Sequence, residues 1–121
     1  MSTTLDNLLR RNLNEVFGQR DAVKRRAAIE EIWSKDGVFV DHNGNHVGHD
    51  ALDAAIVALH RRFPDFSFAE RAPPQILPGA GRLAWGFGPA NAAPKVTGLD
   101  VAFAKADKID ALYVFLDPVA A

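Results

Sequence analysis

Residues 98–117, GLDVAFAKADKIDALYVFLD, form the most regular pattern in the sequence. Apolar residues alternate with others on both sides of Asp107-Lys108, which predicts two antiparallel strands joined by a tight turn. In the second strand both faces are apolar, one formed by Leu112, Val114 and Leu116 and the other by Ala111, Tyr113 and Phe115.

A strand with two apolar faces is not typical of an antiparallel sheet that has one solvated face. Helices of the same chain can cover one face of the sheet. A second copy of the chain is the simplest cover for the other face. We therefore expect a homodimer through the sheet face that bears Tyr113 and Phe115.

Upstream of these strands, apolar residues recur at helical spacing in three places, near 5–17, 21–33 and 50–63. Gly18 is placed to end the first helix, Asp21 to cap the second and Pro64 to follow the third. A short strand is expected at 38–40, after a turn at 36–37, and a four-strand meander after residue 65. Helices followed by strands predict an α+β fold in a single domain over 1–121.

The composition excludes several classes of function. The 121 residues hold 14 Lys plus Arg and 15 Asp plus Glu, so a formal charge of −1 favours neither nucleic acid nor an anionic membrane. The chain has no cysteine, which excludes disulfides and thiolate chemistry. The N-terminal MSTTLDNLLRRNLN has no long apolar stretch, so we expect no secretory signal and a cytoplasmic protein.

Two segments carry a resemblance to a known superfamily. The segment from Trp33 to Asp41, followed by Gly48 and a helix, resembles the acid-bearing strand of nuclear transport factor 2-like proteins. Residues 98–103 and 107–117 resemble the last two strands of that superfamily. The sequence is most similar to the SnoaL-like branch, which includes polyketide cyclases and is related to ketosteroid isomerase and limonene epoxide hydrolase. The resemblance implies a cystatin-like cone, with three helices on a curved mixed sheet around an apolar pocket, and commonly a dimer.

Asp41 is the first candidate catalytic residue, because it ends an apolar strand and matches the general base of ketosteroid isomerase. An apolar pocket would raise the pKa of this carboxylate and make it a usable base near neutral pH. The alternative is that Asp41 only organises the turn that follows it. His42 lies next to it and could assist proton transfer.

Asp100 is the second candidate, because polyketide cyclases of the resembling branch carry one acid/base aspartate on this strand. Alternation places it opposite Leu99, Val101 and Phe103, so it faces the dimer side if those three line the pocket. A bulge would turn it inward, and an interface carboxylate paired with Arg82 or another base is the alternative. The oxyanion donors of ketosteroid isomerase would fall near Leu13 and Leu99, which cannot donate hydrogen bonds, so we expect no ketosteroid isomerisation.

Three histidines, His42, His46 and His49, lie near Asp41 and Asp50 and would suit a metal. Their spacing fits no helix-borne pair and the segment is rich in turn residues, so we expect a polar mouth loop, with no metal and no cofactor. His60 is expected at a helix boundary.

Ten apolar side chains are candidates to line the pocket, with plain core packing as the alternative role for each. Trp85 could also offer its indole N–H to a ligand. The candidates are Phe17, Trp33, Phe39, Ile56, Leu59, Phe63, Trp85, Leu99, Val101 and Phe103.

Two functions follow from these observations. The first is a small cofactor-independent enzyme that uses an aspartate as acid/base on an apolar carbonyl compound, as an isomerase or cyclase, or activates water as an epoxide hydrolase does. The second is a ligand-binding or dimerisation module with the same pocket and no chemistry. A fold-level likeness does not choose between them.

Overall fold

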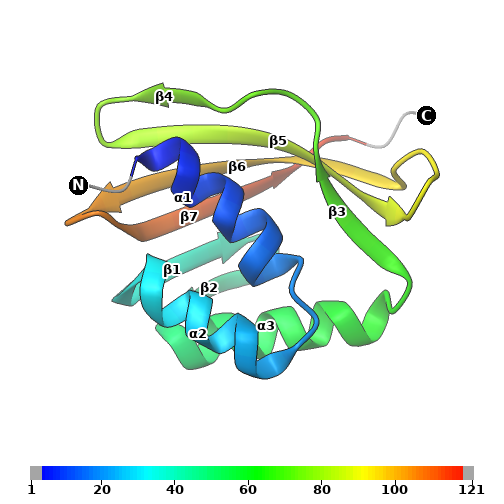
Figure 1. Cartoon of the computed structure of the whole chain (residues 1–121), viewed down its shortest axis with the longest axis horizontal. Coiled ribbons are helices and arrows are strands. Elements are labelled where there is room, and N and C mark those ends of the chain that lie inside the picture. Colours follow the sequence, from blue (N-terminus) through cyan, green and yellow to red (C-terminus); the bar gives the residue numbers. More distant parts are fainter. Residues whose placement is uncertain (1–3, 119–121) are drawn as a thin grey trace.

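The structure, a computed structural model, describes residues 4–118 (Figure 1). Residues 1–3 and 119–121 of the predicted 1–121 domain lie outside the described residues. The helical elements are α1 (Leu5–Arg11), the π-helical η1 (Asn12–Phe17), α2 (Ala22–Ile32) and α3 (His49–Arg62). The strands are β1 (Trp33–Asp41), β2 (Gly44–Val47), β3 (Phe66–Glu70), β4 (Gln75–Leu77), β5 (Ala80–Pro89), β6 (Val96–Lys105) and β7 (Lys108–Leu116).

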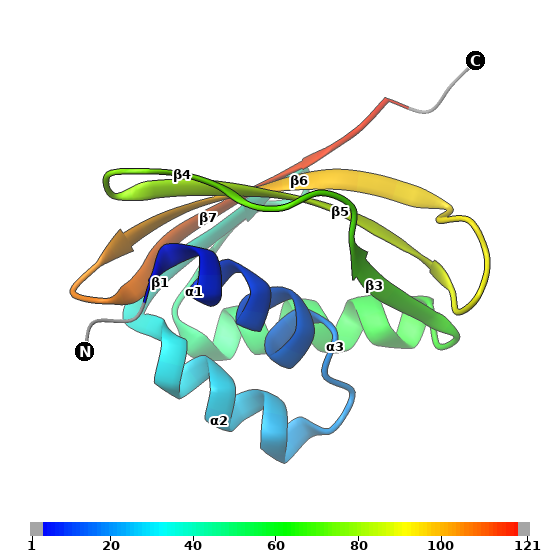
Figure 2. The same cartoon turned by 45° about the horizontal axis from the view of Figure 1, so that its top comes forward.

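The sheet has the strand order β2-β1-β7-β6-β5-β3, with β4 paired to β5. Only the β1–β7 pair among these is parallel, so the sheet is mixed and mostly antiparallel. In the described part of the chain the helices lie on one face of this curved sheet, and the other face is bare (Figure 2). The predicted α+β cone of three helices on a curved mixed sheet is confirmed.

The helix boundaries follow local signals that the sequence shows. Asp21 caps α2, because its carboxylate accepts a hydrogen bond from the Lys24 N–H at 2.9 Å. The N-terminal helix runs from α1 into η1 and ends at Gly18, as predicted. No helix within residues 4–118 is long and apolar enough to cross a membrane.

Three details of the strands differ from the predictions. Strand β1 begins at Trp33, directly after α2, and absorbs the expected turn at 36–37 as an irregularity in its pairing with β7. The short strand β2 was not predicted. Strands β3 and β4 both pair with β5 instead of forming a simple meander, because Pro73 and Pro74 lie between them and cannot donate ladder hydrogen bonds.

The sheet register decides which side chains face the helices. On β6 the buried residues are Gly98, Asp100 and Ala102, while Leu99, Val101 and Phe103 lie on the bare outer face. The expectation that these three apolar residues line the pocket was therefore wrong. No bulge is needed to turn Asp100 inward, since the irregularity between β6 and β7 falls later, between Phe103 and Ala104.

Candidate functional site

The space between the concave face of the sheet and α3 is not filled, and it leaves a pocket of about 440 Å³. Aromatic and aliphatic side chains form most of its wall. Polar groups reach it from the turn after β1, from the end of α3 and from β6. The lining residues are Leu13, Phe17, Phe39, Asp41, His42, Asn43, His46, Ala55, Ala58, Leu59, Arg62, Phe63, Phe68, Trp85, Phe87, Val96, Asp100, Val114 and Leu116.

Asp100 is the buried acid of this pocket, and it is only 4% exposed. Its Oδ1 accepts a hydrogen bond from the indole Nε1 of Trp85 at 2.8 Å. Burial raises the pKa of Asp100 to about 7, and the Trp85 hydrogen bond lowers it by less than burial raises it. Near neutral pH the carboxyl group can therefore be present in its protonated and its ionised form, and it can give or take a proton.

Asp41 ends β1 and lies at the polar side of the same pocket. Its Oδ1 accepts a hydrogen bond from the Asn43 N–H at 2.9 Å, so it does organise the turn. The Nε2 of His46 lies 3.3 Å from the same oxygen, and the imidazole is stacked on Phe39 with ring centroids 5.0 Å apart. Within residues 4–118 no side-chain or turn hydrogen bond engages Oδ2, which leaves that oxygen available to a ligand.

The two acids flank one residue of the central strand β7. Asp100 pairs with Val114 across β6 and β7. Val40 pairs with Tyr113 in the parallel β1–β7 register, so Asp41, the next residue, lies beside Val114 from the other side. Two strand spacings separate the acid-bearing strands, about 10 Å. A small molecule seated over Val114 would lie between the two carboxyl groups.

The fold that positions these acids is found in several solved structures. A proposed isomerase of the SnoaL-like family from Agrobacterium tumefaciens has a TM-score of 0.85 at 22% identity, over 92% of this chain and 95% of that one. A proposed SnoaL-like polyketide cyclase from Jannaschia has a TM-score of 0.74 at 12% identity, over 91% and 83%. A nuclear transport factor 2-like protein of unknown function from Exiguobacterium has a TM-score of 0.73 at 20% identity, over 93% and 99%.

The chain has the nuclear transport factor 2-like fold. The predicted resemblance is thus confirmed at the level of the fold. No protein-family model and no curated protein matches the sequence.

Eight of the predicted site residues line the pocket. They are Asp41, His42 and Asp100 among the polar candidates, and Phe17, Phe39, Leu59, Phe63 and Trp85 among the apolar ones. The indole N–H of Trp85 is not offered to the cavity, because it donates to Asp100. Arg82, named as a partner of Asp100 only in the alternative interpretation, hydrogen-bonds Gln75.

Five predicted lining residues lie elsewhere. Leu99, Val101 and Phe103 are on the outer face of β6, as described above. Trp33 and Ile56 are buried in the core and do not reach the pocket. Trp33 donates its indole N–H to the buried Asn12 side chain at 2.9 Å, which satisfies its one polar atom inside the core.

Sequence reasoning missed several pocket residues. His46 was assigned only to a mouth loop, and Arg62 was not singled out at all. Strand β2 pairs with β1 in a register that places His46 opposite Phe39. Because β2 was not predicted, this contact could not be predicted either. The alternation in β3 and β5 was visible and does place Phe68 and Phe87 on the pocket side.

The other histidines have structural partners. The Nε2 of His49 lies 3.1 Å from the carbonyl oxygens of Trp33 and Ser34. The Nε2 of His60 lies 2.7 Å from the carbonyl oxygen of Phe17 and joins α3 to η1, and burial lowers the pKa of this imidazole. Among residues 4–118 no group of three or more His, Asp or Glu side chains is arranged to hold a metal ion.

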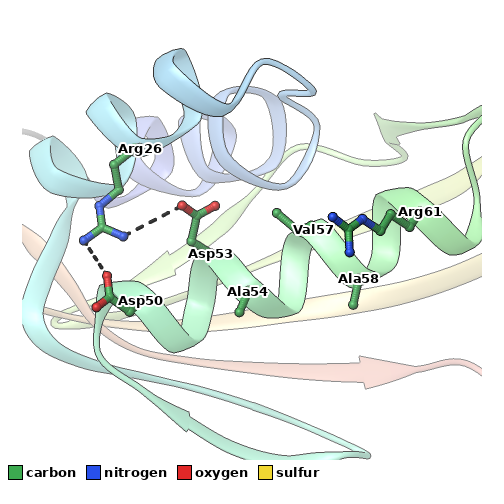
Figure 3. A pocket seen from close by; sticks show the side chains of 7 residues that line it. All are labelled: Arg26, Asp50, Asp53, Ala54, Val57, Ala58 and Arg61. Atoms are coloured by element: carbon green, nitrogen blue, oxygen red, sulfur yellow. Dashed lines mark ion pairs between the residues drawn. The ribbon is translucent and has the colours of Figure 1, made fainter.

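A second hollow lies outside the cone, between α2 and α3 (Figure 3). It is an open groove in which Arg26 forms ion pairs with Asp50 at 2.8 Å and with Asp53 at 3.8 Å. Arg25, buried beside it, donates to the other Asp53 oxygen at 2.6 Å. These pairs tie α2 to α3, so the acids of this groove are used in packing the helices. Arg61 lines the same groove.

Proposed function

We propose that this protein binds an apolar carbonyl compound in the cone and moves a proton at the carbon next to the carbonyl, as an isomerase or a cyclase. The observation that carries the proposal is the position of Asp100, a buried carboxyl group that faces an apolar pocket and has its pKa raised to about 7. Perturbed carboxyl groups in clefts are typical of acid/base catalysis.

The two acids have different surroundings, which suits different roles. Asp41, held through Oδ1 by Asn43 and His46, would act as the base and take the proton through Oδ2. The electron pair of the broken C–H bond moves into the carbonyl group and forms an enolate. Asp100 in its protonated form would donate a hydrogen bond to the enolate oxygen. The enolate then takes the proton back at another carbon, in an isomerase, or attacks a second carbonyl carbon, in a cyclase.

The sequence raised an objection to enolate chemistry, because leucines occupy the positions of the oxyanion donors. Leu13 and Leu99 cannot stabilise an enolate, and Leu13 does line the pocket. The register places Asp100, not Leu99, on the pocket face. A protonated Asp100 would supply the hydrogen-bond donor that neither leucine can supply. Two structures with the same fold, the proposed isomerase and the proposed polyketide cyclase, are consistent with this class of reaction.

Proton exchange tests the proposal without knowledge of the natural substrate. Small cyclic ketones and β,γ-unsaturated ketones are incubated in D₂O, and loss of the proton signals next to the carbonyl is followed by NMR. We expect exchange above the buffer rate with the wild type and a loss of at least about 100-fold in Asp41→Asn. Asp65→Asn, an exposed position outside the pocket, is the matched control. Ketones that bind without exchange would contradict the proposal and leave a binding module.

We also propose that the bare sheet face forms the interface of a homodimer. Phe103, Tyr113 and Phe115 are 43%, 40% and 57% exposed on this face. The rings of Phe103 and Tyr113 lie 6.0 Å apart, and Leu99 and Val101 are half-buried beside them. Such a patch is typical of an interaction surface, since the helices cover only the opposite face (Figure 2).

A further inference from the structure

The mouth of the pocket is polar, whereas its interior is apolar. His42, Asn43 and Arg62 line the pocket and are exposed. The rest of the wall consists largely of aromatic and aliphatic side chains, with Asp100 as the buried acid. A ligand that satisfies both zones has an apolar body and a polar end that stays at the mouth.

Arg62 carries the one permanent positive charge among the lining residues. Its guanidinium lies over the ring of Phe63, with Cζ 5.4 Å from the ring centroid, and Phe63 lines the pocket too. Within residues 4–118 no ion pair joins Arg62 to a carboxylate. A guanidinium is the side chain best suited to bind a carboxylate through two parallel hydrogen bonds.

Asp41 lines the same pocket but does not neutralise the charge of Arg62. Its Oδ1 already accepts a hydrogen bond from the Asn43 N–H and lies 3.3 Å from Nε2 of His46, and among residues 4–118 no ion pair joins Asp41 to Arg62. Arg62 belongs to α3 and Asp41 to β1, on two different elements that line the pocket. The charge on Arg62 is therefore available to a ligand.

A structural role at the helix end is the competing explanation for Arg62. Cations in the last turn stabilise a helix, and α3 ends with His60, Arg61 and Arg62. Arg61 meets that need equally well, yet it lines the outer groove between α2 and α3 (Figure 3). The helix-end explanation predicts that both arginines affect stability and that neither affects ligand choice.

We infer that the ligand of this pocket is a carboxylate with an apolar body, and that Arg62 binds its carboxylate group at the mouth. The inference rests on the proposed function, because the inferred ligand is the substrate of the proposed reaction. The substrate class is then an apolar keto acid. Its carboxylate pairs with Arg62, and its reacting carbonyl group lies deeper, between Asp41 and Asp100.

The test compares two probes with the same apolar body, naphthylacetate and naphthylacetamide, by isothermal titration calorimetry at pH 8 and low salt. We expect the wild type to bind the carboxylate about tenfold more tightly than the amide, which is the effect of one exposed charge-assisted pair. Arg62→Gln should abolish the preference and leave the amide affinity unchanged. Arg61→Gln is the matched control and should keep the preference. Added salt should weaken only the binding of the carboxylate.

Three results would overturn the inference: equal binding of the two probes by the wild type, a preference that survives in Arg62→Gln, or no binding of either probe. Failure of the inference and failure of the proposed function remain distinguishable. Proton exchange on ketones by a wild type that binds the two naphthyl probes equally would remove only the inference. A carboxylate preference that depends on Arg62, without exchange on any ketone or keto acid, would remove only the function.

Discussion

The indole Nε1 of Trp85 donates a hydrogen bond to Oδ1 of Asp100 at 2.8 Å, and both residues line the pocket. This bond stabilises the ionised form of the carboxyl group, while burial destabilises it. Burial has the larger effect, so the pKa rises to about 7. The pair thus sets a buried acid at the pH where proton transfer in both directions is possible.

Replacement of Trp85 by phenylalanine should raise the pKa of Asp100 further, because the ionised carboxylate loses its hydrogen-bond donor. The measurement is an NMR titration of the carboxyl carbon. Trp33→Phe is the matched control: it removes an equally buried indole whose partner is Asn12. That control should leave the titration of Asp100 unchanged. A lower pKa in Trp85→Phe would show that the indole does not stabilise the anion.

Asp100→Asn should change how stability depends on pH. The folded pKa lies above the ordinary value of 3.8, so protonation of Asp100 favours the folded state. Its contribution is complete below about pH 4 and is lost as the pH rises through about 7. Relative to Asp100→Asn, the wild type should lose up to about 4 kcal/mol of unfolding free energy over this range. Urea unfolding at several pH values measures the difference, and parallel curves for the two proteins would contradict the prediction.

Proton exchange on a bound ketone should fall as the pH rises through about 7. The reason is that Asp100 loses the proton that it donates to the carbonyl oxygen. In Asp100→Asn this limb of the pH profile should disappear, because the amide donates at every pH. A wild-type rate that keeps rising above pH 8 would exclude Asp100 as the donor.

The bare face of the sheet gives a prediction on assembly. Phe115→Glu places a charge in the exposed apolar patch and should convert a dimer to a monomer in light scattering at micromolar concentration. Val23→Glu is the matched control, because Val23 is 80% exposed on α2, and the helices lie on the opposite face of the sheet. A wild type that is already monomeric would refute the proposed interface.

Much of the fold could be predicted from local patterns. The stop at Gly18, the cap at Asp21 and the alternation in the last two strands are each confirmed. These signals work because capping and side-chain alternation depend on residues close together in the sequence. The pairing of β3 and β4 along one edge of β5 depends on contacts across the sheet, and the sequence pattern did not show it.

Periodicity could not show which side chains of β6 face the pocket. This orientation had the largest effect on the prediction of the site. Over residues 98–104 of that strand both faces are apolar apart from Asp100, so the larger side chains at 99, 101 and 103 suggested the wrong pocket face. Gly98 was the one residue in the sequence that indicated the correct face. A side chain there would collide with the ring of Trp85, which packs against this glycine and reaches Asp100 two residues on. A glycine inside a strand marks such a close approach.

The most direct test of the account is the pKa of Asp100, measured by NMR titration of its carboxyl carbon, with the signal assigned by its absence in Asp100→Asn. A value of about 7 is predicted, because the carboxyl group is buried in an apolar pocket and has the Trp85 N–H as its donor. A value at or below 3.8 would show that Asp100 stays ionised at neutral pH, and the proposed role as proton donor to a bound carbonyl would then be wrong.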